Sequence, residues 1–379
     1  MYSRLISYPK NRSFFLFGPR GTGKSSWVQS EFLNALYIDL LEAEVYNDLL
    51  ANPQRLSKFI PKGFTDWIII DEVQKIPELL DEVHRLIEKQ KSKFVLTGSS
   101  ARKLKRKGVN LLAGRALTLS LFPLTAFETQ KDFNLSKALK FGQLPRIYGE
   151  EDPQRFLESY VKTYLQEEVQ QEGLTRNLGA FGRFLEAASF SQASTLNISS
   201  VSRDCLVERK VVQNYFQILE DLLLADFLPI FTKKAKRKMS IHSKFYFFDV
   251  GVYRTVRPMG PLDSPAEAEG PALETLFFQE LKAMNAYLNL NYGLFYWKTA
   301  TDIEVDFILY GPKGLKAFEV KRTGKVRKED LGGLKTFLSD YPMAKAYFIY
   351  GGEKSFFIDN IEVIPFTECL LKLPEILQN

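Results

Sequence analysis

Cysteine is scarce in this sequence, with only Cys205 and Cys369 among 379 residues. The two lie far apart and fit no spacing of metal ligands, which argues against disulfides and structural zinc and favours a reducing compartment. Long apolar runs are also missing, and the N-terminus lacks the apolar core and small-residue cleavage site of a secretion signal. We therefore expect a soluble, cytoplasmic protein.

Acidic residues are absent from two stretches of the chain. Residues 89–127 contain nine Lys or Arg, and residues 233–244 contain six around His242. The net charge of +6 is modest, so this uneven distribution is more informative than the total. Two separated basic tracts favour a polyanion as partner, whereas each tract alone is equally compatible with a solubilising loop.

The length of the chain favours two or three domains, because 379 residues exceed what one hydrophobic core usually supports. In residues 1–150, short β-branched or aromatic runs alternate with longer helical patterns, which is typical of an α/β domain with a parallel sheet wrapped by helices. We predict strands at Ser13–Phe17, Leu36–Asp39, Trp67–Asp71, Phe94–Gly98 and Ala116–Leu121.

Residues 151–258 read as a helical and winged-helix domain. Asn197–Asp221 has the arrangement of a helix-turn-helix, with Asn197 or Ser199 as the N-cap. The other predicted elements are amphipathic helices at Pro153–Gln171 and Phe181–Phe190 and a candidate β-wing at Ala225–Asp249.

A linker is predicted at residues 259–271, where Pro, Gly, Glu and Ala concentrate. Residues 272–379 begin with a helical pattern and continue with strand patterns, which indicates a third domain of the α/β class. The predicted strands are Leu294–Lys298, Glu304–Tyr310, Ala317–Lys321 and Ala346–Tyr350.

The segment GPRGTGKS matches the eight-position pattern of a phosphate-binding loop. It follows the apolar run FFLF and opens a helical pattern, as that loop requires. In such a loop, backbone amides face the phosphates, Lys24 reaches the β and γ oxygens, and Ser25 ligates magnesium. A chance glycine-rich turn is the alternative. The predicted ATP-binding residues are Gly18, Pro19, Arg20, Gly21, Thr22, Gly23, Lys24, Ser25 and Ser26.

The segment WIIIDE supplies the partner of this loop, because it is an apolar strand that ends in two carboxylates. Asp71 is predicted to hold the magnesium ion and Glu72 to polarise the attacking water. The expected reaction is the transfer of the ATP γ-phosphate to water.

Three further side chains are candidates for catalytic roles. Thr97 and Ser99, in LTGSS, lie where a sensor of the γ-phosphate is needed, although a capped turn explains them equally well. Arg115 is a candidate arginine finger for the ATP of a neighbouring subunit, which requires an oligomer. It is equally compatible with an ordinary surface arginine.

Four segments, GPRGTGKS, WIIIDEVQKIP, LTGSSARKL and LLAGRALTLSLFPLTAFE, resemble a family of prokaryotic AAA-type ATP-binding proteins with a C-terminal nuclease-like domain. The resemblance covers nearly the whole chain. It implies an ATPase core, a winged-helix middle and a C-terminal domain similar to the PD-(D/E)XK nucleases, which have the restriction-endonuclease fold. It is also compatible with a homo-oligomer such as a hexamer.

Glu274, Asp306, Glu319 and Lys321 resemble the nuclease pattern of an acid, an Asp and a Glu-x-Lys. Residues two apart on a strand share a face, so Glu319 and Lys321 point together, and Asp306 on an adjacent strand can converge with them. The carboxylates would bind magnesium, with Lys321 as a catalytic lysine. Glu304 could face the same site. The alternative is a solvated cross-strand ion pair.

Polar side chains of the helix-turn-helix candidate suit contacts to DNA, although such a module can equally bind protein or close over the ATP site. They are Ser199, Ser202, Arg203, Arg209, Lys210 and Gln213. In a ring-shaped oligomer, the segment ARKLKRK at 101–107 would line the pore.

Taken together, these patterns predict an ATP- and magnesium-dependent motor or remodeller of DNA, with a DNA-binding winged helix and a metal-dependent nuclease-like domain. The main alternative is a nucleotide-controlled regulatory or partner-binding ATPase with an inactive nuclease-like domain. A P-loop kinase is weaker, because the additional domains and the basic tracts would have no role.

Overall fold

The computed structural model describes residues 2–99, 104, 112–165, 169, 177–233, 242–261 and 263–379. The chain forms two compact units. One comprises Ile6–Phe122 with Asp221–Leu223, and the other comprises Met1–Leu5, Pro123–Glu220 and Leu224–Asn379. Within the described ranges, no helix combines the length and the apolar character needed to cross a membrane.

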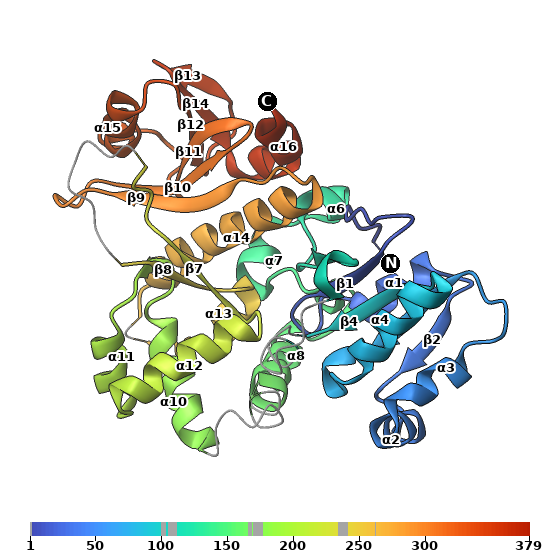
Figure 1. Cartoon of the computed structure of the whole chain (residues 1–379). Helices are drawn as coiled ribbons and strands as arrows, with labels where there is room; N and C mark the ends of the chain where they lie inside the picture. Colours follow the sequence, from blue (N-terminus) through green and yellow to red (C-terminus); the bar gives the residue numbers. More distant parts are fainter. Residues whose placement is uncertain are drawn as a thin grey trace. The chain divides into compact units, whose positions relative to one another are not determined.

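The unit around Ile6–Phe122 contains a parallel five-stranded sheet of order β2-β3-β4-β1-β5 (Figure 1). Its strands are β1 Ser13–Phe17, β2 Leu36–Asp39, β3 Trp67–Asp71, β4 Lys93–Gly98 and β5 Ala116–Ser120. Its helices are α1 Lys24–Glu31, α2 Ala43–Ala51, α3 Leu56–Phe59 and α4 Leu79–Gln90. The predicted parallel sheet with surrounding helices is confirmed.

The parallel direction of the buried strands determines where a ligand site can form. Every residue of β1 and β3 is buried, as expected for strands covered on both faces. Helix α4 contributes Leu79, Val83 and Leu86 to the same core at helical spacing. Because all five strands are parallel, their carboxyl ends lie at one edge of the sheet, where the loops after β1, β3 and β4 begin.

The middle of the chain is mainly helical, with a small antiparallel sheet of order β6-β8-β7. Its helices are α6 Ala126–Thr129, α7 Leu135–Phe141, α8 Pro153–Ser159, a π-helix at Tyr160–Leu165, α10 Leu178–Ser189, α11 Ile198–Cys205, α12 Arg209–Asp221 and α13 Val250–Val256. Its strands are β6 Ser194–Thr195, β7 Ala225–Leu228 and β8 Lys244–Phe247.

The two helices predicted for the helix-turn-helix are present as α11 and α12. The side chain of Asn197, one of the two predicted N-caps, accepts a hydrogen bond from the Ser200 amide at 3.1 Å. Strands β7 and β8 fall inside the predicted wing, whose residues 234–241 lie outside the described part of the chain. The winged-helix assignment itself remains a prediction.

The C-terminal sheet is mixed and has the order β13-β14-β12-β11-β10-β9. Its strands are β9 Gly293–Lys298, β10 Glu304–Gly311, β11 Gly314–Val320, β12 Lys345–Tyr350, β13 Phe356–Ile358 and β14 Ile361–Pro365. Its helices are α14 Pro265–Tyr287, α15 Gly332–Asp340 and α16 Phe366–Gln378. Four of these strands are predicted from the sequence, whereas β13 and β14 are not.

The prediction of a linker at residues 259–271 is wrong in its second half, because α14 begins at Pro265. Proline is favourable in the first turn of a helix, where its missing N–H is not needed, and the Ala and Glu residues that follow favour helix. Pro271 is also accommodated within α14, and the Thr275 hydroxyl donates to its carbonyl at 2.5 Å. The proposed domain limits at 150, 258 and 272 remain predictions.

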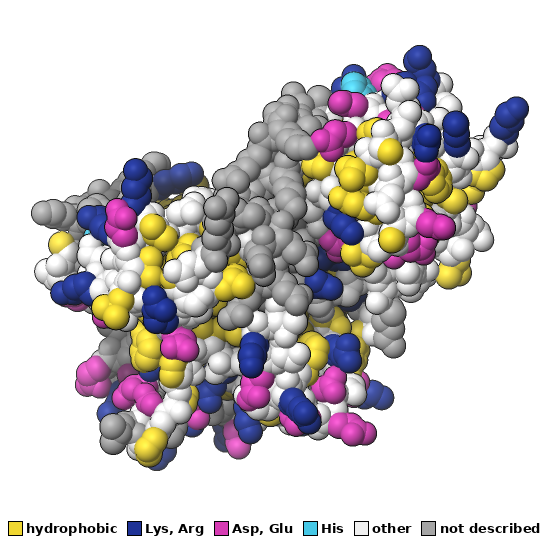
Figure 2. Space-filling view, turned by 90° about the horizontal axis from the view of Figure 1, so that it is seen from below, with side chains coloured by type: hydrophobic (Ala, Val, Ile, Leu, Met, Phe, Trp, Pro, Cys, Tyr) yellow, Lys and Arg dark blue, Asp and Glu magenta, His cyan; other side chains and the backbone are white. Residues whose placement is uncertain are grey.

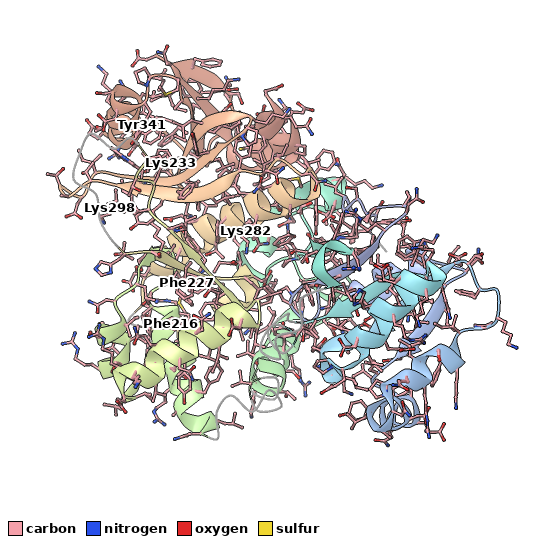
Figure 3. The ribbon with its side chains drawn as sticks, viewed as in Figure 1. Phe216, Phe227, Lys233, Lys282, Lys298 and Tyr341 are labelled. Carbon is pink, nitrogen blue, oxygen red and sulfur yellow. The ribbon has the colours of Figure 1, made fainter. Side chains whose placement is uncertain are left out.

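A segment after β7 packs against the C-terminal sheet. The Phe231 amide donates to the Tyr296 carbonyl at 2.7 Å, and the Tyr296 amide donates to the Pro229 carbonyl at 3.0 Å. The ring of Phe231 is buried in the core of this sheet. Nearby, the Tyr341 hydroxyl donates to the Lys233 carbonyl at 3.1 Å (Figure 3). The middle helices and the C-terminal sheet thus belong to one compact unit.

Candidate nucleotide site and C-terminal carboxylate cluster

The loop between β1 and α1 depends on three glycines. Gly21 and Gly23 have φ angles of 82° and 90°, a left-handed backbone that glycine adopts without steric cost. Gly18 is needed for a different reason, because a Cβ there would lie 2.2 Å from the carbonyl oxygen of Leu121. The loop leads directly into the N-terminus of α1, where unpaired amides and the helix dipole favour a phosphate.

Lys24, the first residue of α1, is buried and held by the loop. Its ammonium donates to the carbonyl oxygens of Gly18 at 2.7 Å and Pro19 at 3.1 Å. The Thr22 hydroxyl donates to the same Pro19 carbonyl at 2.8 Å. Phosphate oxygens would bind this ammonium more strongly than neutral carbonyls do. The remaining predicted nucleotide-binding residues, at exposed or half-buried positions, are Arg20, Ser25 and Ser26.

Asp71 ends β3 as a buried carboxylate with a donor on each oxygen. Thr97 donates to Oδ1 and the Tyr37 hydroxyl donates to Oδ2. Burial and the hydrogen bond to Asp71 raise the pKa of Tyr37 far above its ordinary value, and the nearby Ser25 side chain opposes this shift. Ser25 and Asp71 are thus both close to the Tyr37 hydroxyl, and their hydroxyl and carboxylate are the hard oxygen donors that suit magnesium.

Tyr37 is a site residue that the sequence analysis missed, although strand alternation offers a signal for it. Asp39 is aligned with Asp71 across β2 and β3. Tyr37 precedes Asp39 by two residues and so lies on the same face of the sheet as Asp71.

Glu72 follows Asp71 with an unusual backbone, at a φ of 60°. A non-glycine residue in this region carries a conformational cost of about 1 kcal/mol or more, and such residues cluster at functional sites. Its carboxylate accepts a hydrogen bond from the Gln74 amide, which also donates to the Ser99 hydroxyl at 3.1 Å. Its own amide lies 3.3 Å from the Thr97 hydroxyl. The structure thus brings Glu72, Thr97 and Ser99 together and adds Gln74, which the sequence analysis missed.

Arg115 lies just before β5 and pairs with Glu88 of α4. This hydrogen bond lowers the pKa of the Glu88 carboxyl group. Within one chain, the guanidinium therefore has an acidic partner in its own unit. The arginine-finger role of Arg115 remains a prediction.

The predicted C-terminal residues converge on one place. Glu274 of α14, Asp306 of β10 and Glu319 of β11 are joined there by Glu304 at the start of β10; these four residues are the carboxylate cluster. Burial raises the pKa of Glu274 to about 7 and that of Glu319 to about 8, and the charge of Asp306 adds to both shifts. The Lys321 ammonium lies 2.7 Å from Oε1 of Glu319.

Lys244 of β8 enters the carboxylate cluster from the middle of the chain. Its ammonium lies 2.5 Å from Oε1 of Glu304, 3.3 Å from Oε2 of Glu274 and 3.5 Å from Oδ1 of Asp306. Burial alone would lower the pKa of this ammonium, but the carboxylates hold it well above its ordinary value. The sequence analysis placed Lys244 in a basic wing and missed this role.

A divalent metal ion does not fit the carboxylate cluster alongside Lys244. Among the residues that the structure describes, no group of three or more His, Cys, Asp or Glu is arranged to hold a metal ion. Glu274 and Asp306 are both predicted to bind magnesium, but each forms an ion pair with the Lys244 ammonium instead. The central cation of the cluster is thus an ammonium.

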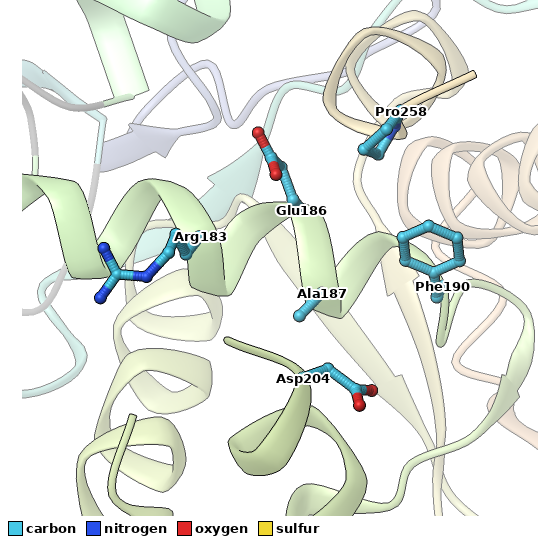
Figure 4. A pocket seen from close by; sticks show the side chains of 6 residues that line it. All are labelled: Arg183, Glu186, Ala187, Phe190, Asp204 and Pro258. Carbon is cyan, nitrogen blue, oxygen red and sulfur yellow. The ribbon is translucent and has the colours of Figure 1, made fainter. Parts of the chain in front are cut away.

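Two pockets occur away from both predicted sites. One, of about 390 Å³, lies beside α10 (Figure 4), and the other, of about 580 Å³, lies beside α7. The first is lined by Arg183, Glu186, Ala187, Phe190, Asp204 and Pro258. Neither pocket contains a residue predicted from the sequence to bind nucleotide or metal.

Residues 10–130 match the family model described as AAA domain. The N-terminal part of the chain is thus a P-loop domain of the AAA type, as its motifs predict. Residues 132–263 and 269–369 match two further models, each described as a domain of unknown function.

The chain is 25% identical over 322 residues to an uncharacterized protein of Mycobacterium tuberculosis, covering 81% of this chain and 70% of the relative. It is also 25% identical over 353 residues to an uncharacterized protein of Methanocaldococcus jannaschii, covering 84% and 77%. The Aeropyrum pernix ORC1 protein in complex with DNA is 12% identical, with a TM-score of 0.24 and coverage of 72% and 89%. This TM-score is low, and nothing about fold or function follows from it.

Proposed function

We propose that the chain binds ATP with magnesium at Gly18–Ser26 and hydrolyses it to ADP and phosphate. The observation that carries this proposal is that the Tyr37 hydroxyl donates to Asp71 of β3 and lies close to the side chain of Ser25 in the loop. Two oxygen donors from separate segments thereby reach one point beside the buried Lys24, as a magnesium-nucleotide site requires.

Each residue has a defined task in this proposal. Lys24 exchanges its loop carbonyls for β and γ phosphate oxygens. Ser25 and Asp71 hold magnesium, which neutralises phosphate charge when bound. Glu72 orients the attacking water and is itself held by Gln74.

Thr97, Ser99 and Arg115 extend the proposal beyond ATP binding. Thr97 contacts Asp71, and Ser99 contacts Gln74, so both are placed to respond when the γ-phosphate leaves. Arg115 would leave Glu88 and reach the ATP of a neighbouring subunit in a homo-oligomer such as a hexamer.

Steady-state hydrolysis and nucleotide binding test the ATPase. Lys24→Ala should abolish tight ATP binding, whereas Glu72→Gln should retain ATP and lower kcat at least 10-fold. Glu353→Gln, a matched change at an exposed carboxylate outside the site, should leave hydrolysis within about twofold of the wild-type rate. Hydrolysis at the wild-type rate by Glu72→Gln would show that Glu72 does not activate the water.

We infer DNA as the target of the ATPase from α11 and α12. Five polar side chains of this helix pair that were selected from the sequence are exposed, namely Ser199, Arg203, Arg209, Lys210 and Gln213. Ser202 instead donates to the Val207 carbonyl at 2.6 Å and stabilises the turn. Nine of the fifteen Lys and Arg residues in the two basic tracts lie outside the described residues. On the face shown in Figure 2, basic and acidic side chains are interspersed. Contact with DNA on that face would therefore depend on individual basic residues and not on a continuous basic surface.

The DNA proposal is tested by measuring ATP hydrolysis with duplex, single-stranded and branched DNA, with cleavage of labelled DNA followed in the same tubes. Stimulation by one form that is lost in Arg209→Ala/Lys210→Ala supports a DNA-acting motor or remodeller. Unchanged hydrolysis without DNA retention supports the alternative, a nucleotide-controlled partner-binding ATPase with an inactive nuclease-like domain. The position of Lys244 within the carboxylate cluster favours that alternative for the C-terminal sheet.

A further inference from the structure

The carboxylate cluster joins β8 to α14 and β10 through a single ammonium. Lys244 is only 2% exposed, and its ammonium also lies 5.6 Å from the centre of the Tyr296 ring. A lysine ammonium has three N–H donors, and three carboxylate oxygens lie within 3.5 Å of Lys244. Its bonding capacity can therefore be met entirely inside the cluster.

Further hydrogen bonds and ion pairs hold the cluster, although Oε2 of Glu319 is buried and has no hydrogen-bond partner among the described residues. Oδ2 of Asp306 accepts from the Val320 amide at 2.9 Å. Oε2 of Glu304 lies 3.2 Å from the Lys298 ammonium, and Oε2 of Glu274 accepts from the Tyr246 hydroxyl at 3.3 Å. A divalent ion entering the cluster would have to displace several of these partners.

Magnesium requires about six oxygen ligands at roughly 2.0–2.1 Å in octahedral geometry. The oxygens of Glu274 and Asp306 that face the middle of the cluster already contact the Lys244 ammonium. Removing Lys244 would leave several buried carboxylates without their shared cation, which is the arrangement that attracts a divalent ion.

We propose that Lys244 is the built-in cation of the carboxylate cluster, and that the cluster accepts a divalent ion only after this ammonium is removed. The cluster then serves to fix β8 against β10 and α14, and a metal site is latent in it. This inference is independent of ATP hydrolysis at the other site.

The test uses the full-length chain without nucleotide and Mn²⁺ as the probe. Calorimetry and electron paramagnetic resonance of free Mn²⁺ give the number of ions bound by the wild type, Asp306→Asn, Lys244→Met and the double variant. We expect equal numbers for the wild type and Asp306→Asn, one additional ion for Lys244→Met, and loss of that ion in the double variant. Mn²⁺ should also raise the Tm of Lys244→Met. In the wild-type background, the effect of Mn²⁺ on Tm should be the same with and without the Asp306→Asn change.

Lys282→Met is the matched control. Lys282 lies on α14 and pairs with Asp226 outside the cluster, so its loss should add no ion at the cluster (Figure 3). An Asp306-dependent Mn²⁺ in the wild type would overturn the proposal, and so would the absence of an additional ion in folded Lys244→Met. If Lys244→Met folds only in the presence of Mn²⁺, and the double variant fails to fold even then, the proposal is supported. The comparison of wild type with Asp306→Asn does not depend on how well the Lys244 variant folds.

Discussion

The hydroxyl of Tyr37 on β2 donates a hydrogen bond to the carboxylate of Asp71 on the neighbouring strand β3. The other oxygen of Asp71 accepts from Thr97, so both carboxylate oxygens are paired with neutral hydroxyls. Such donors can be replaced by a metal ion without separating an ion pair. Under the proposed function, this pairing keeps the buried carboxylate hydrogen-bonded until magnesium takes the place of the hydroxyls.

Tyr37→Phe should lower the free energy of unfolding of the nucleotide-free protein by about 1–2 kcal/mol, because a buried carboxylate oxygen loses its donor. The loss should shrink with ATP and Mg²⁺, since a metal ion at Asp71 would take the freed oxygen. Urea unfolding under both conditions measures this difference. Tyr8→Phe removes an exposed hydrogen bond to Glu31 and should cost less than about 0.5 kcal/mol. Equal losses with and without nucleotide would contradict the magnesium role of Asp71.

Gly18→Ala should weaken ATP binding at least 10-fold and lower the free energy of unfolding by roughly 1–3 kcal/mol. The new methyl group would lie 2.2 Å from a backbone oxygen of Leu121, so the loop or β5 must shift. Gly149→Ala is the control, because no atom lies within 4 Å of a Cβ at that position. Fluorescent-nucleotide binding and urea unfolding provide the two measurements, and wild-type binding by Gly18→Ala would contradict the loop geometry.

Gln74→Leu should lower kcat for ATP hydrolysis roughly 10-fold and change KM less than twofold, because Glu72 loses the amide that orients its carboxylate. Stability should change little, since the two lost hydrogen bonds of the side-chain amide are offset by removal of the buried Oε1, which has no hydrogen-bond partner among the described residues. Steady-state kinetics and thermal unfolding separate the two effects. Gln154→Leu, at an exposed pair with Glu158, is the control. A variant with unaltered kcat would remove Gln74 from the site.

Glu280→Gln should make the protein more stable at pH 8 than the wild type, by roughly 2–4 kcal/mol, with a smaller difference at pH 5. Burial raises the pKa of Glu280 to about 8, whereas an unfolded glutamate titrates near its ordinary value of 4.5. Between these values the folded state holds the proton that the unfolded state has lost, so wild-type stability falls as pH rises through this window. Urea unfolding from pH 5 to 8 measures the slope. A slope unchanged in Glu280→Gln would assign the pH dependence to other groups.

The sequence predicts the N-terminal sheet well because four of its five strands are short runs that end in, or are followed directly by, glycine or an acidic residue. WIIID and FFLF are clear for this reason, and the phosphate-binding loop follows from its glycine spacing. Strands β13 and β14 are short or mixed in composition, and without their pairing partner they do not differ from a loop. Helix α14 starts in a Pro- and Gly-rich stretch that a local rule assigns to a linker.

The missed site residues share one physical cause, because tertiary contacts assign their roles. Lys244 belongs to a basic tract in the sequence, and only the folding of β8 onto α14 brings it to Glu274, 30 residues later. Gln74 acts through a side-chain amide that also reaches Ser99. Local patterns selected most residues of the two candidate sites but could not identify the side chains that hold them in place.

The burial of Phe231 in the C-terminal core sets a limit on how the chain can be divided. Its ring packs among Phe295, Phe337 and Tyr341, although it lies far upstream of the segment 269–369 that matches a separate family model. A fragment that starts at residue 269 would lack this ring and would have a cavity in its core. It would also lack Lys244. Such a fragment should fold poorly and aggregate, so an autonomous C-terminal module must begin before Pro229.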